Sequence, residues 1–414
     1  MISSLTISGL GLTPANRFGR WGVATALLCL AVWLLAPPPA HAAPYRPGSD
    51  AEVLERLPLR AGDATSRERQ ALRQRLRSNP RDAEAAAALA QSHLDELAAE
   101  GDPRQAGYAQ AALRPWWNEP APPADLRVQR AVLRQFSHDF EPALADLRAV
   151  VAGDPTHAQA WAWIAAISLV IARFDDARAA CTALEPHTSA LMGSACSASI
   201  LATTGQAAAA ASQLKAALAT PAAQTATDER LWALTRLAEA LERTGQAEPA
   251  GAAFREALAL PRKDQYLRAA HADFLLDQGR PTEVLKALAD ASASDVLLLR
   301  LALAAKAAND PSLPRWRDAL AARFQAAEQR GDTTHRKEQA RFTLHVQGDA
   351  AAALPLAQQN FAQQKELADA RLLLEAALAA RQRSAAEPAL RWLAESRAEH
   401  PRLRALEQAL RALP

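Results

Sequence analysis

One phrase of helical pattern recurs along the chain at a nearly constant interval, and it limits the fold more than any other feature. Between residues 231 and 261, an apolar stripe with helical spacing is broken by Gly245, resumes as a second stripe and stops at Pro261. The first stripe contains Leu234, Leu237, Ala238 and Leu241, and the second contains Ala250, Phe254, Ala257 and Leu258. This order predicts a helix, a tight turn, a second helix and a stop.

The turn glycine of this phrase has counterparts at similar spacing. Gly279 follows Gly245 by 34 residues, and Gly205 is an earlier turn glycine. The equivalent positions before Gly205 are Ala172, 33 residues upstream, and His138, a further 34 residues upstream. A period near 34 made of two helices is typical of a repeat array, in which each helix pair covers its apolar face with the next pair and contacts only its neighbours. Because no alternating β-branched run suggests a strand, we expect an all-α fold.

The repeated phrase resembles the tetratricopeptide repeat, and Trp161 stands where that motif carries its tryptophan. The resemblance extends from residue 79 to the C-terminus and is most specific in the middle of the chain. It implies a right-handed superhelical solenoid of antiparallel helix pairs. It also implies an open concave groove, lined by the first helix of each pair, along which a peptide or a partner segment would lie.

The sequence is expected to contain four regions. Residues 1–42 combine a positive start, an apolar run and a small-residue cleavage site, which is the order of a secretory signal peptide. An uncleaved membrane anchor is the alternative, although the 15-residue run is shorter than the roughly 20 residues of a membrane span. Residues 43–78 are expected to form a linker and an N-terminal helix. Residues 79–290 hold six repeats, and residues 291–414 hold degenerate repeats and a capping helix.

The expected location is the periplasm. Removing residues 1–42 removes Arg17 and Arg20 and no carboxylate, which leaves 45 basic and 45 acidic side chains. A net charge of zero argues against a nucleic-acid partner, since such binders carry a strong basic excess. We expect no cofactor, and no strong membrane association once the signal peptide is removed.

Two cysteines remain after residue 42, Cys181 near the end of one predicted helix and Cys196 within the next. They lie at equal distances from the loop between those helices, and an oxidising compartment permits a disulfide between them. Two buried thiols that pack as small hydrophobic groups are the alternative. Helix phase decides between the two, and the sequence does not fix it.

Candidate binding residues follow from the resemblance, as first-helix positions that would face the concave side. They are Gln135, Phe136, Gln159, Trp232, Glu239, Arg243, Tyr266, Asp273, His335 and Phe342. Aromatic anchors beside charges are typical of binding surfaces. The alternative is a solvated helix face with a few aromatics packed on their neighbours. Of the adjacent Trp116 and Trp117, one is expected to fill the gap between repeats one and two, and the other either packs there too or contacts a partner.

Catalytic and metal-binding motifs are absent from the sequence. None of the eight histidines after residue 42 stands in His-Glu-x-x-His, and neither a Gly-rich phosphate loop nor Gly-x-Ser-x-Gly occurs. We therefore expect a non-catalytic periplasmic scaffold that binds another envelope protein or peptide in its groove. One alternative is an assembly subunit of an outer-membrane secretion or polysaccharide-export machine. Another is a helical-toroid, glycan-cleaving enzyme that would use Glu239, Arg243, Tyr266 and Asp273.

Overall fold

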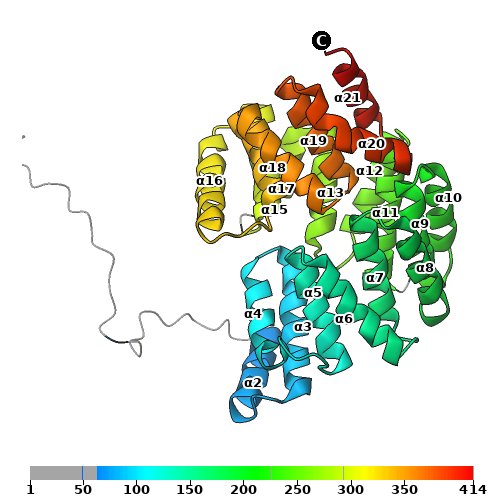
Figure 1. Cartoon of the computed structure of the whole chain (residues 1–414), viewed down its shortest axis with the longest axis vertical. Helices are drawn as coiled ribbons and strands as arrows, with labels where there is room; N and C mark the ends of the chain where they lie inside the picture. Colours follow the sequence, from blue (N-terminus) through cyan, green and yellow to red (C-terminus); the bar gives the residue numbers. More distant parts are fainter. Residues whose placement is uncertain (1–48, 50–62, 225, 292, 414) are drawn as a thin grey trace, which may run out of the picture. The chain divides into compact units, whose positions relative to one another are not determined.

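The computed structural model of the chain describes Ser49 and residues 63–224, 226–291 and 293–413. The chain divides into two units, Met1–Ala61 and Gly62–Pro414. The predicted signal peptide and nearly all of the predicted linker before residue 63 lie outside the described residues. In the second unit, the described elements are helices and none is a strand (Figure 1). None of these helices is both long enough and apolar enough to cross a membrane.

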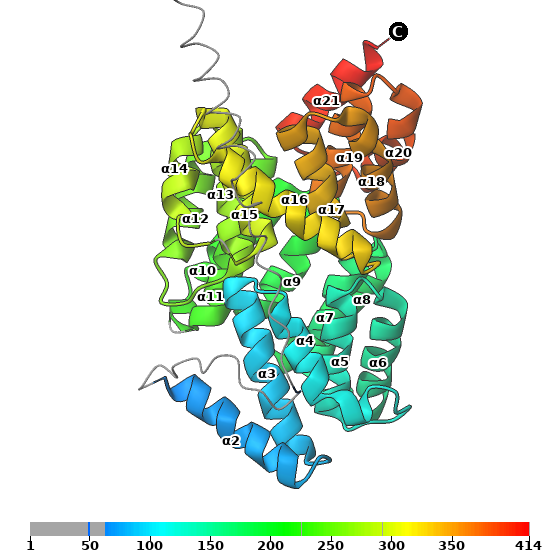
Figure 2. The same ribbon diagram turned by 90° about the vertical axis from the view of Figure 1, so that its left-hand side faces the viewer.

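Consecutive helices of this unit pack on each other as pairs, and successive pairs stack side by side (Figures 1 and 2). The pairs are α3 (Ala83–Glu100) with α4 (Arg104–Ala112), α5 (Ala124–Phe136) with α6 (Phe140–Gly153), α7 (Ala158–Val170) with α8 (Phe174–Leu184), α9 (Ala190–Thr203) with α10 (Ala207–Leu218), α11 (Thr227–Arg243) with α12 (Ala247–Leu258), α13 (Gln265–Asp277) with α14 (Pro281–Ala287), α15 (Asp295–Ala308) with α16 (Leu313–Gln329), α17 (Arg336–Phe342) with α18 (Ala350–Gln363), and α19 (Leu367–Ala379) with α20 (Glu387–Ser396). Helix α2 (Ala64–Ser78) precedes the pairs and α21 (Pro401–Arg411) follows them. The predicted all-α fold of stacked helix pairs is confirmed.

The pair α11–α12 shows why the repeated phrase forms two helices. Asp228 lies in the first turn of α11 and Arg243 in its last turn, where their charges complement the helix dipole. The predicted stripes are buried, with Leu237 and Phe254 in the core. Each such side chain contributes roughly 1.5–3 kcal/mol when it leaves water. Leu258 is the exception, because it is the last residue of α12 and is exposed.

The turn inside five of the pairs was expected at a glycine or its counterpart, at His138, Ala172, Gly205, Gly245 and Gly279, and the backbone confirms this series. In each pair from α5–α6 onward, one residue of the turn that follows the first helix adopts a left-handed conformation with positive φ. These residues are His138 (60°), Ala172 (61°), Gly205 (78°), Gly245 (78°), Gly279 (68°), Asn309 (53°), Gly348 (81°) and Arg381 (54°). Only glycine adopts this conformation without a steric cost from Cβ. The backbone at His138, Ala172 and Arg381 is therefore held in this conformation by the packing of the pairs.

Helices near the C-terminus contact the turns of much earlier pairs. The backbone N–H of Lys365, between α18 and α19, donates to the carbonyl of Val170 at 2.8 Å. The Arg402 side chain, on α21, donates to the Asp277 carbonyl at 2.7 Å. The expectation that each pair contacts only its neighbours is therefore wrong for this unit. The first helices were expected to line an open groove. Instead, residues 365–367 line a pocket together with residues of the first helices α7, α9 and α11, so the chain itself covers part of that face.

Candidate functional site

Two adjoining pockets lie among α9, α11, the start of α13 and the segment between α18 and α19. The larger one, about 350 Å³, is called the aromatic pocket and is lined by Asp228, Leu231, Trp232, Thr235, Arg236, Arg262, Asp264 and Tyr266. The smaller one, about 50 Å³, is called the cationic pocket and is lined by Leu169, Ser199, Ala202, Thr203, Arg236, Glu239, Arg243, Tyr266, Lys365, Glu366 and Leu367. Arg236 and Tyr266 border both pockets, so this pair of side chains forms the wall between them.

The shared wall is a stack of Arg236 on Tyr266. The guanidinium carbon lies 4.5 Å from the centre of the tyrosine ring, which is a cation–π contact. Tyr266 donates its hydroxyl proton to Glu239 at 2.6 Å, and Arg236 forms an ion pair with the same carboxylate at 3.1 Å. Burial alone would lower the pKa of Arg236, but Glu239 and Tyr266 outweigh it and raise that pKa. Glu239 is thus neutralised within the wall, while Tyr266 stays 49% exposed.

The aromatic pocket gains its second ring from α11. Trp232 stands one helical turn before Arg236, so the two side chains lie on the same face of the helix. Asp264 borders the other side and caps α13 by accepting the Leu267 N–H at 2.7 Å, and burial raises the pKa of its carboxyl. The pocket therefore offers two aromatic surfaces inside a polar rim.

The cationic pocket holds two positive side chains without a counter-ion. Arg243 donates to the Thr203 hydroxyl at 3.2 Å. Within the described ranges, no carboxylate lies at ion-pair distance from Arg243 or Lys365. Burial lowers the pKa of Arg243, and the field of Glu239 only partly offsets that effect. Glu366, the other acid of this pocket, is paired with Lys337 at 3.3 Å.

Asp273 was expected in the groove but belongs to a separate ion-pair cluster. Its carboxylate pairs with Arg300 of α15 at 2.6 Å and with Arg341 of α17 at 2.8 Å. Burial would raise the pKa of Asp273, but the two guanidinium groups outweigh it and hold that pKa well below its usual range. Because neighbouring first helices supply both arginines, Asp273 stabilises the stacking of pairs and lines neither pocket.

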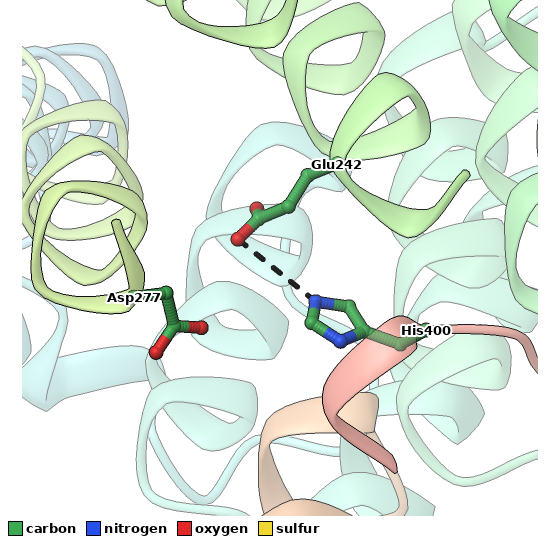
Figure 3. A group of neighbouring side chains, drawn as sticks. All are labelled: Glu242, Asp277 and His400. Carbon is green, nitrogen blue, oxygen red and sulfur yellow. Dashed lines mark ion pairs between the residues drawn. The ribbon is translucent and has the colours of Figure 1, made fainter. Parts of the chain in front are cut away.

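Glu242, Asp277 and His400 form the group of side chains closest to a metal-ligand arrangement among the described residues (Figure 3). The Nδ1 of His400 accepts the Arg402 backbone N–H at 3.2 Å, so a neutral ring carries its proton on Nε2. That Nε2 lies 3.9 Å from a carboxylate oxygen of Glu242, which is beyond hydrogen-bond distance. Asp277 is already paired with Arg371 at 2.6 Å. These contacts favour an ion-pair cluster over a metal site.

A third pocket, of about 320 Å³, brings together two other predicted residues. Phe136 and His335 both line it, and Trp117 lies beside them. The guanidinium of Arg134 covers the Trp117 ring at 5.8 Å. Trp116 is buried in the core, which confirms that one of the adjacent tryptophans packs between the first pairs.

The remaining candidate residues lie outside the pockets. Phe342 is 2% exposed and packs on Phe324 with ring centres 5.4 Å apart, so its assignment to the groove is wrong. Helix α16 supplies that partner, which helical spacing alone could not show. Gln135 is half-buried and Gln159 is exposed, and neither lines a pocket.

Sequence reasoning brought Trp232, Glu239, Arg243 and Tyr266 to the two adjoining pockets but missed Arg236 and Lys365. Arg236 had a usable signal, because it stands between Trp232 and Glu239 at helical spacing. Lys365 had none, because it reaches the pocket from a segment far along the chain.

Cys181 and Cys196 form a disulfide in the structure. Their Cα atoms are 5.7 Å apart, and the bond joins α8 to α9 within the buried core. The bond therefore connects two consecutive helix pairs.

Comparison with known proteins finds only distant likenesses. No protein-family profile and no curated protein matches the chain. Among solved structures, a tetratricopeptide repeat protein from Parabacteroides merdae ATCC 43184 is 13% identical, with a TM-score of 0.36 over 64% of this chain and 93% of that one. The Cut9–Hcn1 hetero-tetramer of the APC/C is 14% identical, with a TM-score of 0.48 over 84% of this chain and 67% of that one. The P58(IPK) TPR domain is 13% identical, with a TM-score of 0.25 over 70% of this chain and 98% of that one. Because all three TM-scores are below 0.5, nothing is concluded from them, and the tetratricopeptide-like fold rests on the stacked helix pairs described above.

Proposed function

We propose that the chain is a periplasmic, non-catalytic scaffold that binds a segment of another envelope protein in the aromatic pocket. The observation that carries the proposal is Tyr266, a half-exposed aromatic residue stacked on Arg236 beside Trp232. Tryptophan, tyrosine and arginine are the residues that dominate binding energy at protein interfaces. The pocket volume of about 350 Å³ suits one or two side chains of a partner segment.

Two further observations support the non-catalytic role and the compartment. Glu239, Arg243 and Tyr266 meet in the cationic pocket, but Glu239 is neutralised there by Arg236 and Tyr266. Asp273, the fourth group that an enzyme would use, is held outside the pocket by Arg300. The disulfide between α8 and α9 suits an oxidising compartment, in agreement with the signal peptide expected at residues 1–42.

Site-specific photo-crosslinking in the native host tests this proposal. A photoreactive amino acid at position 232 should capture a partner polypeptide from the cell envelope. The same amino acid at position 108 is the control, since Tyr108 is 51% exposed and lies outside the three pockets. A Tyr266→Ala substitution should abolish the product formed from position 232. The proposal fails if position 232 yields no product, or if both positions yield the same one.

An assembly role in an outer-membrane machine predicts a different fractionation. The captured complex should then sediment with the outer membrane and release the chain only when the membrane is dissolved. A complex that stays in the soluble periplasmic fraction would exclude that role and leave the scaffold role in place.

A further inference from the structure

Helices α18–α21, here called the C-terminal module, have a core of their own. Their buried apolar side chains cluster with Ala340 of α17 and Leu344 of the turn after it, separately from the cluster that extends from α9 to α16. In the described part of the chain, these helices pack closely on one another and on α17, and none packs closely along a helix before α17 (Figure 2). From the earlier pairs, the partly buried Ala172 and Phe174 reach this cluster. The C-terminal module therefore shares little apolar core with the first six pairs.

A series of polar contacts, here called the seam, joins the C-terminal module to five consecutive pairs, from α5–α6 to α13–α14. Each contact lies at the turn of its pair or at the helix end beside it. In the order of the pairs, the Gln363 side chain donates to the His138 carbonyl (3.3 Å), the Lys365 N–H donates to the Val170 carbonyl (2.8 Å), the Ala207 N–H donates to Glu399 (3.2 Å), His400 lies beside Glu242 (3.9 Å), and the Arg402 side chain donates to the Asp277 carbonyl (2.7 Å). Figure 3 shows the end of the seam at Glu242, Asp277 and His400. Water can replace polar contacts of this kind at a small net cost.

Asp277 carries the strongest part of the seam. Its carboxylate accepts two hydrogen bonds from Arg371 of α19, at 2.6 and 2.9 Å, and lies 3.3 Å from Nε of Arg402 of α21. Paired bonds between a guanidinium and a carboxylate are stronger than bonds between neutral groups. One residue at the end of α13 therefore holds two helices of the C-terminal module.

The segment between α18 and α19 covers the first helices of the middle pairs. Its backbone is extended at Gln364 and Glu366, with φ of −136° and −95°. Residues 365–367 line the cationic pocket, together with Ala202 of α9 and Arg243 of α11. The space left there is about 50 Å³, little more than the roughly 30 Å³ that one water molecule occupies in the liquid. This part of the face is therefore closed to a polypeptide.

Helix α17 and the turn after it join the C-terminal module to the rest of the array. Ala340 and Leu344 belong to the core of the module, whereas Phe342 and Val346, between and after them, belong to the core of the preceding pairs. The turn, Thr343–Gln347, is π-helical, a rare conformation that is frequent at functional positions. This joint would keep the C-terminal module attached if the seam were broken.

We propose that the C-terminal module is a lid, which turns about α17, breaks the seam and uncovers the face of α7, α9 and α11 to a partner polypeptide. Moving elements are drawn from the parts of a fold that few apolar contacts hold, as here. The lid goes beyond the proposed function, because its opening is a property of this chain alone and can be measured without a partner.

The reaction rate of a thiol placed under the lid measures its opening. Ala202→Cys puts that thiol in the cationic pocket, at a position that is 5% exposed. The reagent is N-ethylmaleimide, which is uncharged, and mass spectrometry of the non-reduced full chain follows its addition. Ser212→Cys, on α10, is the exposed control, and Val150→Cys, in the core of α6, reports unfolding of the array.

Asp277→Asn should raise the rate at Ala202→Cys about ten-fold, because the seam loses hydrogen bonds to a charged group and the rate follows the open fraction. Arg371 would still pair with Glu375 at 2.7 Å, so the substitution leaves no buried charge without a partner. Asp290→Asn is the matched control and should leave the rate unchanged, since Asp290 pairs with Arg268 of α13 at 2.5 Å, away from the seam.

Three results would overturn the lid. A thiol of Ala202→Cys that reacts as fast as that of Ser212→Cys in the otherwise unaltered chain would mean that residues 365–367 cover nothing. Equal rates in Asp277→Asn and Asp290→Asn would mean that the seam does not control access. A rise at Val150→Cys as large as that at Ala202→Cys would assign the effect to unfolding. The crosslink from position 232 tests the scaffold role separately, so either proposal can fail alone.

Discussion

Substituting alanine for the turn glycines tests whether the C-terminal helices lie against the middle of the array. Gly205 and Gly279 occupy equivalent turns, with φ of 78° and 68°. A Cβ added at Gly205 would lie 2.6 Å from the carbonyl oxygen of Arg397, which follows α20. A Cβ added at Gly279 would have no neighbour within 4 Å. The two substitutions therefore share the backbone effect and differ in the long-range contact.

The magnitudes follow from these distances. The left-handed conformation costs an alanine about 1–2 kcal/mol relative to glycine, so Gly279→Ala should lower the free energy of unfolding by that amount. Gly205→Ala adds overpacking against a backbone atom, which typically costs about 1–3 kcal/mol more. We expect a total loss of about 2–5 kcal/mol for Gly205→Ala.

Urea denaturation followed by far-ultraviolet circular dichroism, with the disulfide intact, measures both losses. The difference between the two variants is the relevant quantity, because effects on the unfolded chain are the same for both. Equal losses would mean that Arg397 does not lie on the α9–α10 turn, and the long-range packing described above would be wrong.

Three further predictions concern stability. The double substitution Cys181→Ser and Cys196→Ser should lower the free energy of unfolding by about 3 kcal/mol, because the disulfide closes a loop with a sequence separation of 15 residues. In urea titrations, a reductant should lower the unfolding free energy of the unaltered chain to the same value. A reductant without effect would contradict the disulfide. Burial against Phe254 and Phe274 lowers the pKa of His271 from 6.5 to about 4, so its contribution to stability is complete above pH 6.5 and is lost as the pH falls toward 4. This loss of unfolding free energy amounts to about 2 kcal/mol between pH 7.5 and pH 5. Urea titrations at the two pH values should show a smaller loss in His271→Leu. The control His187→Leu, which alters an exposed histidine, should show the full loss. Arg381→Gly should raise the free energy of unfolding by about 1 kcal/mol, since φ is 54° there and the side chain is exposed; a lower thermal midpoint would show that Arg381 makes a contact worth more than the relieved strain.

The parts of the fold that depend on local sequence could be predicted. The helix pairs follow from apolar spacing, and even Ala172 and His138 could be recognised as turn positions from the interval to Gly205. Local signals suffice there because a helix and its turn are specified within one repeat.

The candidate site could be predicted only in part, because it depends on contacts between distant repeats. Trp232 and Tyr266 could be found from their helical phase. The same reasoning placed Phe342 and Asp273 in the groove, where α16, α15 and α17 instead bury the ring and neutralise the carboxylate. The phase of one helix gives the direction of a side chain, but not the partner that another repeat brings to it.

The bond from Lys365 to Val170 makes the cationic pocket dependent on the C-terminal part of the chain, and the bond from Arg402 to Asp277 holds α21 on the end of α13. Proteolytic trimming that removes the residues after 364 would delete Lys365, Glu366 and Leu367 from the cationic pocket and free the ends of α7 and α13. A shortened protein would therefore lack one wall of this pocket even where its first helix pairs stay folded.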